Sequence, residues 1–433
     1  MNTQWIVCLT FVVACGSAGS ADEEPILDRP SLDTYACAIE RPRTDHSPLY
    51  WGYGGHAMIT TTGGTALFAR FESMAVDPFN PSPSHFVVSA ITRAGTFGAS
   101  VEIASSDMGT SPVLARRGDG AALLWIDGNA LRFAGLDATG QTAIAPKTIA
   151  GVTLDTFSRP AIAASASGGF GVVYGLEGTQ PKRELWFVAL DASGAAVGAP
   201  RRLAVTTDDY VDPAPVIVPA GAGFAVAWRD RQETRGQIYF AQLDAAGAET
   251  SAAHVISVTD EDDVDAAGAT GFDRATIALL EIAGGFIAAW PEIHEDAESG
   301  AFSLIRLAKL DASGQPQGTP VALRAGVEEV DEVEPTLVRY ADDAVGVLWS
   351  SGSHIYTCGG CVPDHRIDFV LLDPVSLSRL SDVLSVNNGG GRSAGGLLRR
   401  DVAVMGDGIL TTFDQTFHTS SKPSSATFAC TPR

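Results

Sequence analysis

A unit of roughly 50–60 residues recurs along this chain, and its best-preserved copy spans residues 213–257. Short apolar or alternating runs in that copy predict four strands, at 215–218, 224–228, 238–243 and 254–257. We refer to them as strands A, B, C and D. A four-stranded sheet cannot bury both of its faces alone, so copies of the unit have to pack on one another. The repeat therefore outweighs the length of the chain, 433 residues, which by itself favours two or three domains.

Two sequence markers count the copies. The first is a small residue at the start of strand B, followed five positions later by an aromatic residue. It occurs as Gly120 and Trp125, Gly169 and Tyr174, Gly223 and Trp228, Gly285 and Trp290, Ala344 and Trp349, and Gly408 and Phe413. A degenerate copy around Gly64 makes seven. The second marker is Leu-Asp-x-x-Gly after strand C, which begins at Leu136, Leu190, Leu243 and Leu310 and, in a degenerate form, at Leu372.

Seven four-stranded repeats predict an all-β fold, a seven-bladed β-propeller of antiparallel blades, in one domain over residues 34–433. The aromatic residues of the first marker could stack on a ligand or pack between blades. Bulky residues at strand period are usually buried, so we expect packing between blades.

The two ends of the chain are predicted to share one blade. The last copy has runs for strands A and B at 401–405 and 409–413, and a third at 425–430, but no fourth. An extra strand at 34–39 can supply it and close the ring, which removes the exposed edges of an open ring. Cys37 and Cys430 lie on these two strands, so we expect a disulfide between them.

Residues 1–21 are predicted to be an export signal. The apolar run at 5–14 is too short to cross a bilayer, and the context of Cys15 is similar to a bacterial lipoprotein signal, in which Cys15 would be acylated. Ordinary secretion with cleavage after Ala21 is the alternative. Residues 22–33 would then be a tether to the propeller. Both alternatives place the protein outside the cytoplasm, in the cell envelope if Cys15 is acylated and otherwise secreted or periplasmic.

The charge of the chain excludes some partners. There are 51 acidic and 29 basic residues, for a net charge of −22. Nucleic acid and anionic membrane surfaces both require basic partners, so we expect no nucleic acid and membrane attachment only through a lipid anchor. A protein or a glycan remains as ligand, and we expect a monomer.

Function is expected on the face of the ring that carries the B–C and D–A loops, because these loops are long and acidic. The D–A loop that precedes the sixth blade carries an acidic cluster, which consists of Glu328, Glu329, Asp331, Glu332 and Glu334. The candidate binding residues are Asp208, Asp209, Asp212, Asp260, Asp262, Asp263, Asp265, His294 and His418. The favoured hypothesis is a non-catalytic binding or scaffold protein that uses this face.

The loop between strands B and C of the sixth blade has metal-ligand spacing. His354, Cys358, Cys361 and His365 could surround a zinc ion. In an exported protein Cys358 and Cys361 more often form a small disulfide, and a redox-active dithiol is a third possibility. The acidic clusters could bind calcium or simply be solvated. No cofactor is expected, with calcium or zinc as the alternatives.

An enzyme is a second hypothesis for the chain as a whole, and a metal-binding module centred on the loop of the sixth blade is a third. No Gly-x-Ser-x-Gly motif is present, so nothing indicates a serine nucleophile. Paired carboxylates on the loop face would suit a glycan-directed hydrolase or lyase, but the pattern does not single out a pair.

The unit resembles the TolB-type propeller repeat of bacterial envelope proteins. Trp228-Arg229-Asp230-Arg231 and the run from Ile238 to Gly247 carry the likeness. The resemblance implies a propeller in the cell envelope with a partner-binding role. The N-terminal domain that accompanies that propeller is absent from this sequence, which puts the partner-binding role in doubt.

Overall fold

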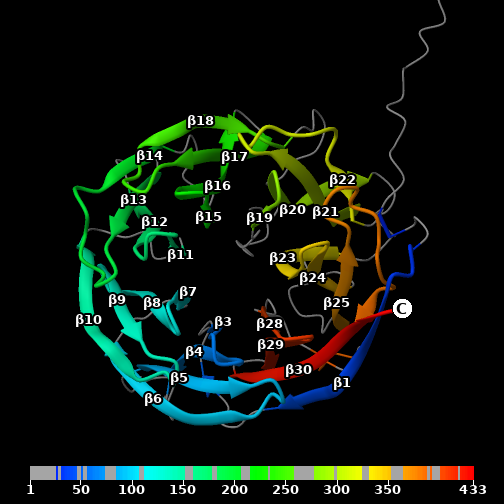
Figure 1. Ribbon diagram of the computed structural model, residues 1–433, viewed down its shortest axis with the longest axis horizontal. Helices are drawn as coiled ribbons and strands as arrows, with labels where there is room; N and C mark the ends of the chain where they lie inside the picture. Colours follow the sequence, from blue (N-terminus) through cyan, green and yellow to red (C-terminus); the bar gives the residue numbers. More distant parts are fainter. Residues whose placement is uncertain are drawn as a thin grey trace, which may run out of the picture.

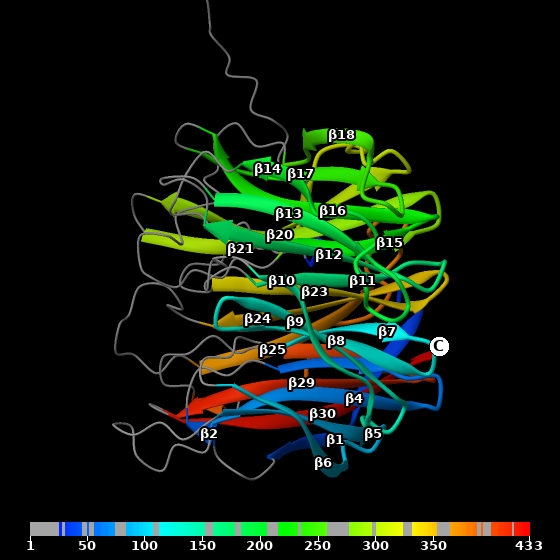
Figure 2. The same ribbon diagram turned by 90° about the vertical axis from the view of Figure 1, so that its left-hand side faces the viewer.

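The structure is a computed structural model. It describes residues 26–27, 31–45, 50–51, 56–73, 84–106, 112–151, 159–177, 183–205, 215–232, 235–257, 277–296, 300–323, 331–352, 364–387, 391–392, 400–417 and 420–433. Seven antiparallel sheets are arranged around a central axis, with the first strand of each nearest the axis (Figure 1). The predicted seven-bladed β-propeller is therefore confirmed. Seen from the side, the strands of every blade run between the two faces of the ring (Figure 2).

The blades follow one another in chain order, and each uses four strands from the axis outward. Blade 1 consists of β3 (His56–Thr60), β4 (Thr65–Ser73), β5 (Ser84–Thr92) and β6 (Phe97–Ser106). Blade 2 consists of β7 (Val113–Arg117), β8 (Gly120–Asp127), β9 (Ala130–Leu136) and β10 (Thr142–Gly151). Blade 3 consists of β11 (Ala161–Ala164), β12 (Phe170–Glu177), β13 (Arg183–Leu190) and β14 (Arg201–Val205). Blade 4 consists of β15 (Val216–Ala220), β16 (Gly223–Gln232), β17 (Arg235–Leu243) and β18 (Glu249–Val255).

The last three blades keep the same order with small additions. Blade 5 consists of β19 (Ala278–Ile282), β20 (Gly285–Asp296), β21 (Gly300–Asp311) and β22 (Val321–Ala322). Blade 6 consists of β23 (Asp331–Ala341), β24 (Ala344–Gly352), β25 (Asp364–Leu372) and β26 (Leu384–Ser385), with β27 (Gly391–Arg392) also paired to β25. Blade 7 consists of β28 (Arg400–Met405), β29 (Gly408–Phe417), β30 (Ser420–Pro432) and β1 (Tyr35–Asp45), with β2 (Tyr50–Trp51) also paired to β30.

The strands of blade 4 extend further than the sequence predicts. The predicted strands at 224–228 and 238–243 leave residues 229–237 as a loop, but β16 and β17 remain paired out to Gln232 and Arg235. The prediction failed because polar residues in an extended hairpin still pair through the backbone, and here Arg229 and Asp230 are also buried. The fourth strand, expected at 254–257, instead covers Glu249–Val255.

The aromatic residues of the first marker are buried, as predicted for packing between blades. All six, Trp125, Tyr174, Trp228, Trp290, Trp349 and Phe413, are at most 2% exposed. The marker glycine itself is explained by backbone contact. At Gly223 a Cβ would overlap the carbonyl oxygen of Leu243, where strand C ends.

A second aromatic contact joins neighbouring blades. Phe240, on strand C of blade 4, lies 5.3 Å from Phe286, on strand B of blade 5, measured between ring centroids. Gly314, in the C–D hairpin of blade 5, has φ of 85° and covers the same ring, so that a Cβ there would overlap Phe240. Phe133 with Gly194, and Phe187 with Gly247, repeat this arrangement in earlier blades. In these hairpins the second marker thus requires glycine for two reasons: its turn has a positive φ, and a side chain there would overlap the phenylalanine ring of the preceding blade.

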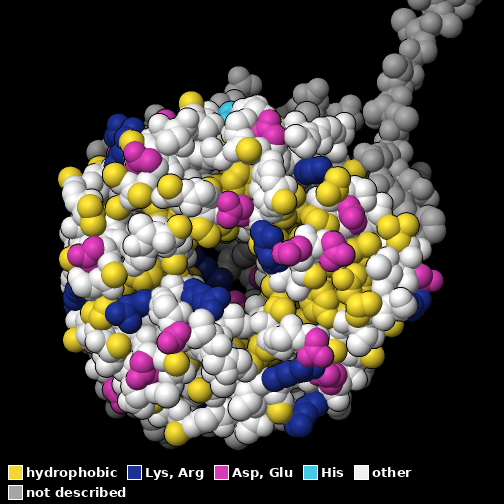
Figure 3. Space-filling view, viewed as in Figure 1, with side chains coloured by type: hydrophobic (Ala, Val, Ile, Leu, Met, Phe, Trp, Pro, Cys, Tyr) yellow, Lys and Arg dark blue, Asp and Glu magenta, His cyan; other side chains and the backbone are white. Residues whose placement is uncertain are grey.

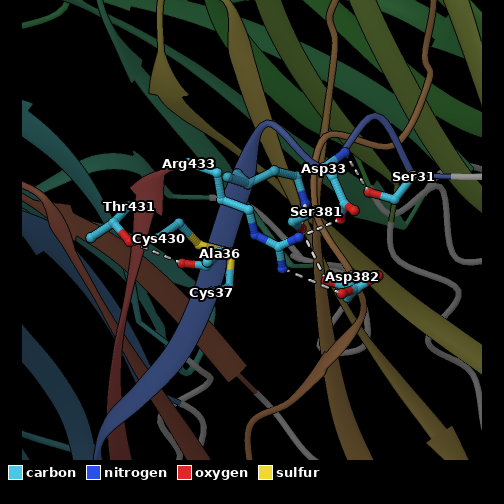
Figure 4. Close-up of polar contacts among 10 residues, drawn as sticks. Ser31, Asp33, Ala36, Cys37, Ser381, Asp382, Cys430, Thr431 and Arg433 are labelled. Atoms are coloured by element: carbon cyan, nitrogen blue, oxygen red, sulfur yellow. Dashed lines mark hydrogen bonds and ion pairs between the residues drawn. A yellow bond between two sulfur atoms is a disulfide. The ribbon is translucent and has the colours of Figure 1, made fainter.

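The ring closes within blade 7, where β1 pairs with β30 in antiparallel register (Figure 4). Cys37 lies opposite Cys430, and the two form the predicted disulfide. Arg433 pairs with Asp33 at 2.6 Å and with Asp382 at 3.7 Å, which joins the C-terminus to blade 6. The closure therefore combines a β-ladder, a covalent bond and ion pairs.

Part of the segment predicted as a tether packs on the propeller. The backbone N–H groups of Ile26 and Leu27 donate to the carbonyls of Ala322 and Leu323, each at 2.9 Å, and Ile26 is fully buried. These two residues lie beside β22, on the outer edge of blade 5, and they pack into the core between blades 5 and 6. No helix in the described part of the chain is long and apolar enough to cross a membrane.

Candidate functional site

Most residues singled out from the sequence lie outside the described part of the chain. These are Cys15, Asp208, Asp209, Asp212, Asp260, Asp262, Asp263, Asp265, His354, Cys358, Cys361 and His418. His294 lies on β20 and His365 on β25, but only their backbone is described. The zinc, calcium and second-disulfide hypotheses thus stay predictions. Within the described ranges, no group of three or more His, Cys, Asp or Glu side chains could hold a metal ion.

A cavity of about 260 Å³ lies on the axis of the ring. Its wall includes four ionisable residues, His56, Arg159, Glu334 and Asp401, with apolar residues between them. The ring is hollowed at its centre in Figure 3, which shows one of its faces. The volume falls just below the range of pockets for drug-sized ligands, so the cavity suits a ligand of about one sugar unit.

The cavity residues converge because of the blade order. His56 begins β3, Asp401 follows the first residue of β28, and Arg159 lies two residues before β11. The innermost strands all run in the same direction along the axis, so their first residues meet at the same end of the channel. Residues that are 345 positions apart, such as His56 and Asp401, thereby become neighbours.

Glu334 has an unusual backbone conformation. Its φ is 54°, and the pairing of β23 with β24 shifts register between Val333 and Thr336. This left-handed conformation costs a residue with a side chain about 1–2 kcal/mol. Glu334 is nonetheless 7% exposed and lines the cavity. A strained, buried acidic residue at a cavity wall is typical of a functional position, because strain persists only where the surrounding structure holds it.

Asp401 and His56 form a pair at the seam of the ring. The Nε2 atom of His56 lies 3.4 Å from the Oδ2 atom of Asp401, with side chains 2% and 31% exposed respectively. The two residues belong to blades 1 and 7, and the His56 ring also packs against Phe68 at 5.1 Å between centroids. The pair gives the cavity an acidic residue with a histidine held beside it.

Among the residues that the structure describes, the remaining wall is mainly apolar and includes one arginine. Val216, Ile277, Ala278 and Leu279 come from blades 4 and 5. Arg159 comes from blade 3. The acidic residues belong to blades 6 and 7, so Arg159 approaches the cavity from the far side of the ring. The cavity can therefore accept a ligand with different chemistry at its two ends.

Other buried acids near this end of the ring have structural partners. Glu292 is fully buried, and it accepts a hydrogen bond of 2.8 Å from the Trp290 indole N–H and one of 2.8 Å from Arg306 Nε. Asp368 accepts a hydrogen bond of 2.6 Å from the Ser351 hydroxyl. These bonds satisfy the polar groups that long B–C hairpins bring into the interior.

Of the cavity residues, the sequence pattern identified only Glu334, as one member of an acidic cluster interpreted as a binding face. His56, Arg159 and Asp401 were missed. One available signal was the proline that opens strand A, because both Arg159 and Glu334 immediately precede one, Pro160 and Pro335. Proline favours an extended backbone in the residue before it, which Glu334 does not adopt, so this signal marks the start of strand A and not the conformation of Glu334.

Comparison with solved structures finds propellers of low sequence identity. A protein of unknown function from Dyadobacter fermentans has a TM-score of 0.50 at 10% identity, with 92% of this chain and 99% of that chain covered. An α-L-arabinofuranosidase of Fusarium graminearum has a TM-score of 0.44 at 9% identity, with 91% and 97% covered. An α-L-arabinanase of Penicillium chrysogenum complexed with arabinobiose has a TM-score of 0.39 at 10% identity, with 59% and 76% covered. No protein-family model and no curated protein matches the sequence. At such identities the likeness to the first of these structures supports the fold alone.

Proposed function

We propose that this protein is an exported, glycan-directed hydrolase whose reaction takes place in the axial cavity. One observation carries the proposal: Glu334 is held in a strained, left-handed conformation while it lines a cavity that also contains the carboxylate of Asp401. Hydrolysis of a glycosidic bond commonly uses two carboxyl groups, one on each side of the bond. The cavity provides two such groups and a volume suited to one sugar unit.

The surroundings of the two acids favour different roles. We assign Glu334, the more buried of the two acids, the role of general acid, which protonates the leaving oxygen. Asp401 is more exposed and lies beside His56. We assign it the role of carboxylate, which either activates water or attacks the sugar. His56 is a positioning residue, since its contact is with Asp401.

The test is turnover on a panel of aryl glycosides and polysaccharides, with Glu334→Gln and Asp401→Asn as variants. Removal of a general acid is expected to lower the turnover about 100- to 10,000-fold. Asp342→Asn is the matched control, because Asp342 is exposed at the other end of β23 and should leave turnover unchanged. The proposal is overturned if both cavity variants retain wild-type turnover. It is also overturned if the panel binds without any turnover, which would make the chain a non-catalytic binding protein.

Export and anchoring complete the proposal. The Cys37–Cys430 disulfide supports export, because such bonds persist in oxidising compartments. We propose that Cys15 carries the lipid that retains the protein at the cell envelope, as a TolB-like propeller of that compartment. Mass spectrometry of the N-terminal peptide from membrane fractions tests the anchor. An unmodified mature N-terminus at residue 22 would show ordinary secretion instead.

A further inference from the structure

The axial cavity carries its positive charge on the wall opposite its acids. Arg159 comes from blade 3, whereas Glu334 and Asp401 come from blades 6 and 7. Blades 4 and 5 separate Arg159 from Glu334, and blades 2 and 1 separate it from Asp401. A ligand that spans the cavity therefore meets carboxyl groups at one end and a guanidinium group at the other.

Arginine recognises one type of ligand group especially well. Its planar guanidinium donates two parallel hydrogen bonds to a carboxylate, and such charge-assisted bonds are about twice as strong as neutral ones. The wall beside it is apolar, formed by Val216, Ile277, Ala278 and Leu279. Apolar surroundings strengthen an ionic contact because they exclude water.

We infer that the substrate is an acidic glycan, whose terminal sugar carries a carboxylate that binds Arg159 while its glycosidic bond lies between Glu334 and Asp401. The inference rests on the proposed function and narrows it to uronic acids and similar carboxylated sugars. The requirement for a single carboxylated unit agrees with the small volume of the cavity, about 260 Å³. The net charge of the chain, −22, repels an anionic glycan elsewhere on the molecule, so recognition depends on this local cation.

The experiment compares matched pairs of substrates that differ only at one carbon. Aryl glucuronides are paired with aryl glucosides, and aryl galacturonides with aryl galactosides, and binding of the free acids and free neutral sugars is measured by calorimetry. Wild-type protein is expected to prefer the acidic member by about 10- to 100-fold in kcat/KM or in affinity. Arg159→Gln should reduce this ratio to near one, because kcat/KM or affinity falls more for the acidic member than for the neutral one.

Two controls keep the result interpretable. Arg116→Gln removes an exposed arginine from β7, the innermost strand of blade 2, and should leave the preference unchanged. Arg159→Lys keeps the charge but loses the paired hydrogen bonds, and should give an intermediate preference. The preference of the wild-type protein for the acidic over the neutral substrate also tests the inference, and this measurement does not depend on whether a variant folds.

The outcomes separate the inference from the function on which it rests. If neutral and acidic sugars react equally, and Glu334→Gln abolishes both reactions, the inference fails and the proposed function stands. A preference for the acid that persists in Arg159→Gln also overturns the inference. If neither kind of sugar binds or reacts, both the inference and the proposed function fail.

Discussion

The packing of blade on blade predicts how two glycines in the same hairpin region differ. Gly314 and Gly318 have nearly the same φ, 85° and 86°. A Cβ at Gly314 would overlap the ring of Phe240 in the preceding blade, whereas a Cβ at Gly318 meets no atom within 4 Å. Replacing each by alanine therefore applies the same backbone strain, and only Gly314→Ala adds a clash.

The expected magnitudes follow from these two terms. Alanine in the left-handed region costs about 1–2 kcal/mol, which is the whole effect expected for Gly318→Ala. An extra methyl group in a packed core costs about 1–3 kcal/mol more, and this should appear only in Gly314→Ala. For a chain of this length the added term lowers the melting temperature by about 1–4 °C if the ring unfolds cooperatively.

Unfolding in urea with tryptophan fluorescence measures both variants against the wild-type protein. Phe240→Leu combined with Gly314→Ala should recover most of the difference, because the smaller side chain makes room for the methyl group. Gly194 and Gly198 form an equivalent pair in blade 3, with the ring of Phe133 beside Gly194. Equal losses for Gly314→Ala and Gly318→Ala would refute the idea that hairpin glycines hold the blades together.

Three further predictions concern stability. Replacing both Cys37 and Cys430 by alanine should lower the unfolding free energy by roughly 2–5 kcal/mol, which urea denaturation of the wild-type protein and the double variant measures. An unchanged denaturation midpoint would contradict this. The pKa of Asp311 is lowered by a hydrogen bond from the Ser313 hydroxyl and by backbone N–H groups. Its folded pKa lies below the unfolded value of about 3.9, so its stabilisation is present above that pH and lost as the pH falls through the folded pKa. Unfolding free energies between about pH 5 and about pH 2 should therefore show Asp311→Asn approaching wild type in acid, and a constant difference would contradict this. Glu334→Gly should raise the unfolding free energy by up to about 1 kcal/mol, because glycine adopts the left-handed conformation without strain, while turnover is lost. A lower denaturation midpoint for this variant would show that the backbone of Glu334 is not strained.

The architecture was predictable because its determinants are local and repeated. In four copies a Cβ at the first-marker glycine would overlap the carbonyl oxygen at the end of strand C, and these glycines are Gly120, Gly169, Gly223 and Gly285. In three of the Leu-Asp-x-x-Gly hairpins the glycine is likewise required by a close contact, with a phenylalanine of the preceding blade. The closing strand was predictable because a ring with three strands in its last blade leaves an edge exposed. Strand ends were less predictable, since Arg229 and Asp230 are polar by type yet buried in an extended hairpin.

The cavity was not predictable in the same way. His56, Arg159 and Asp401 are ordinary charged residues in their local sequence, and the proline after Arg159 does not by itself indicate a site. They come together only because the innermost strands start at one end of a closed ring. The left-handed backbone of Glu334 is likewise invisible in sequence, because a non-glycine residue before proline gives no sign of positive φ.

The site and the closure of the ring depend on the same seam. His56 and Asp401 are the first residues, or nearly so, of the innermost strands of blades 1 and 7, the two blades between which the chain closes. Arg93 of blade 1 pairs with Glu40 of β1 at 2.9 Å and also with Asp407, in the turn between β28 and β29. Blades 1 and 7 are therefore in contact at both ends of β28, through these ion pairs at one end and through His56 and Asp401, 3.4 Å apart, at the other. Because β1 carries both Glu40 and Cys37, the disulfide that fixes β1 to β30 also fixes the strand that supplies one partner of Arg93. Closure of the ring is thus a condition for the chemistry proposed at its axis as well as for stability.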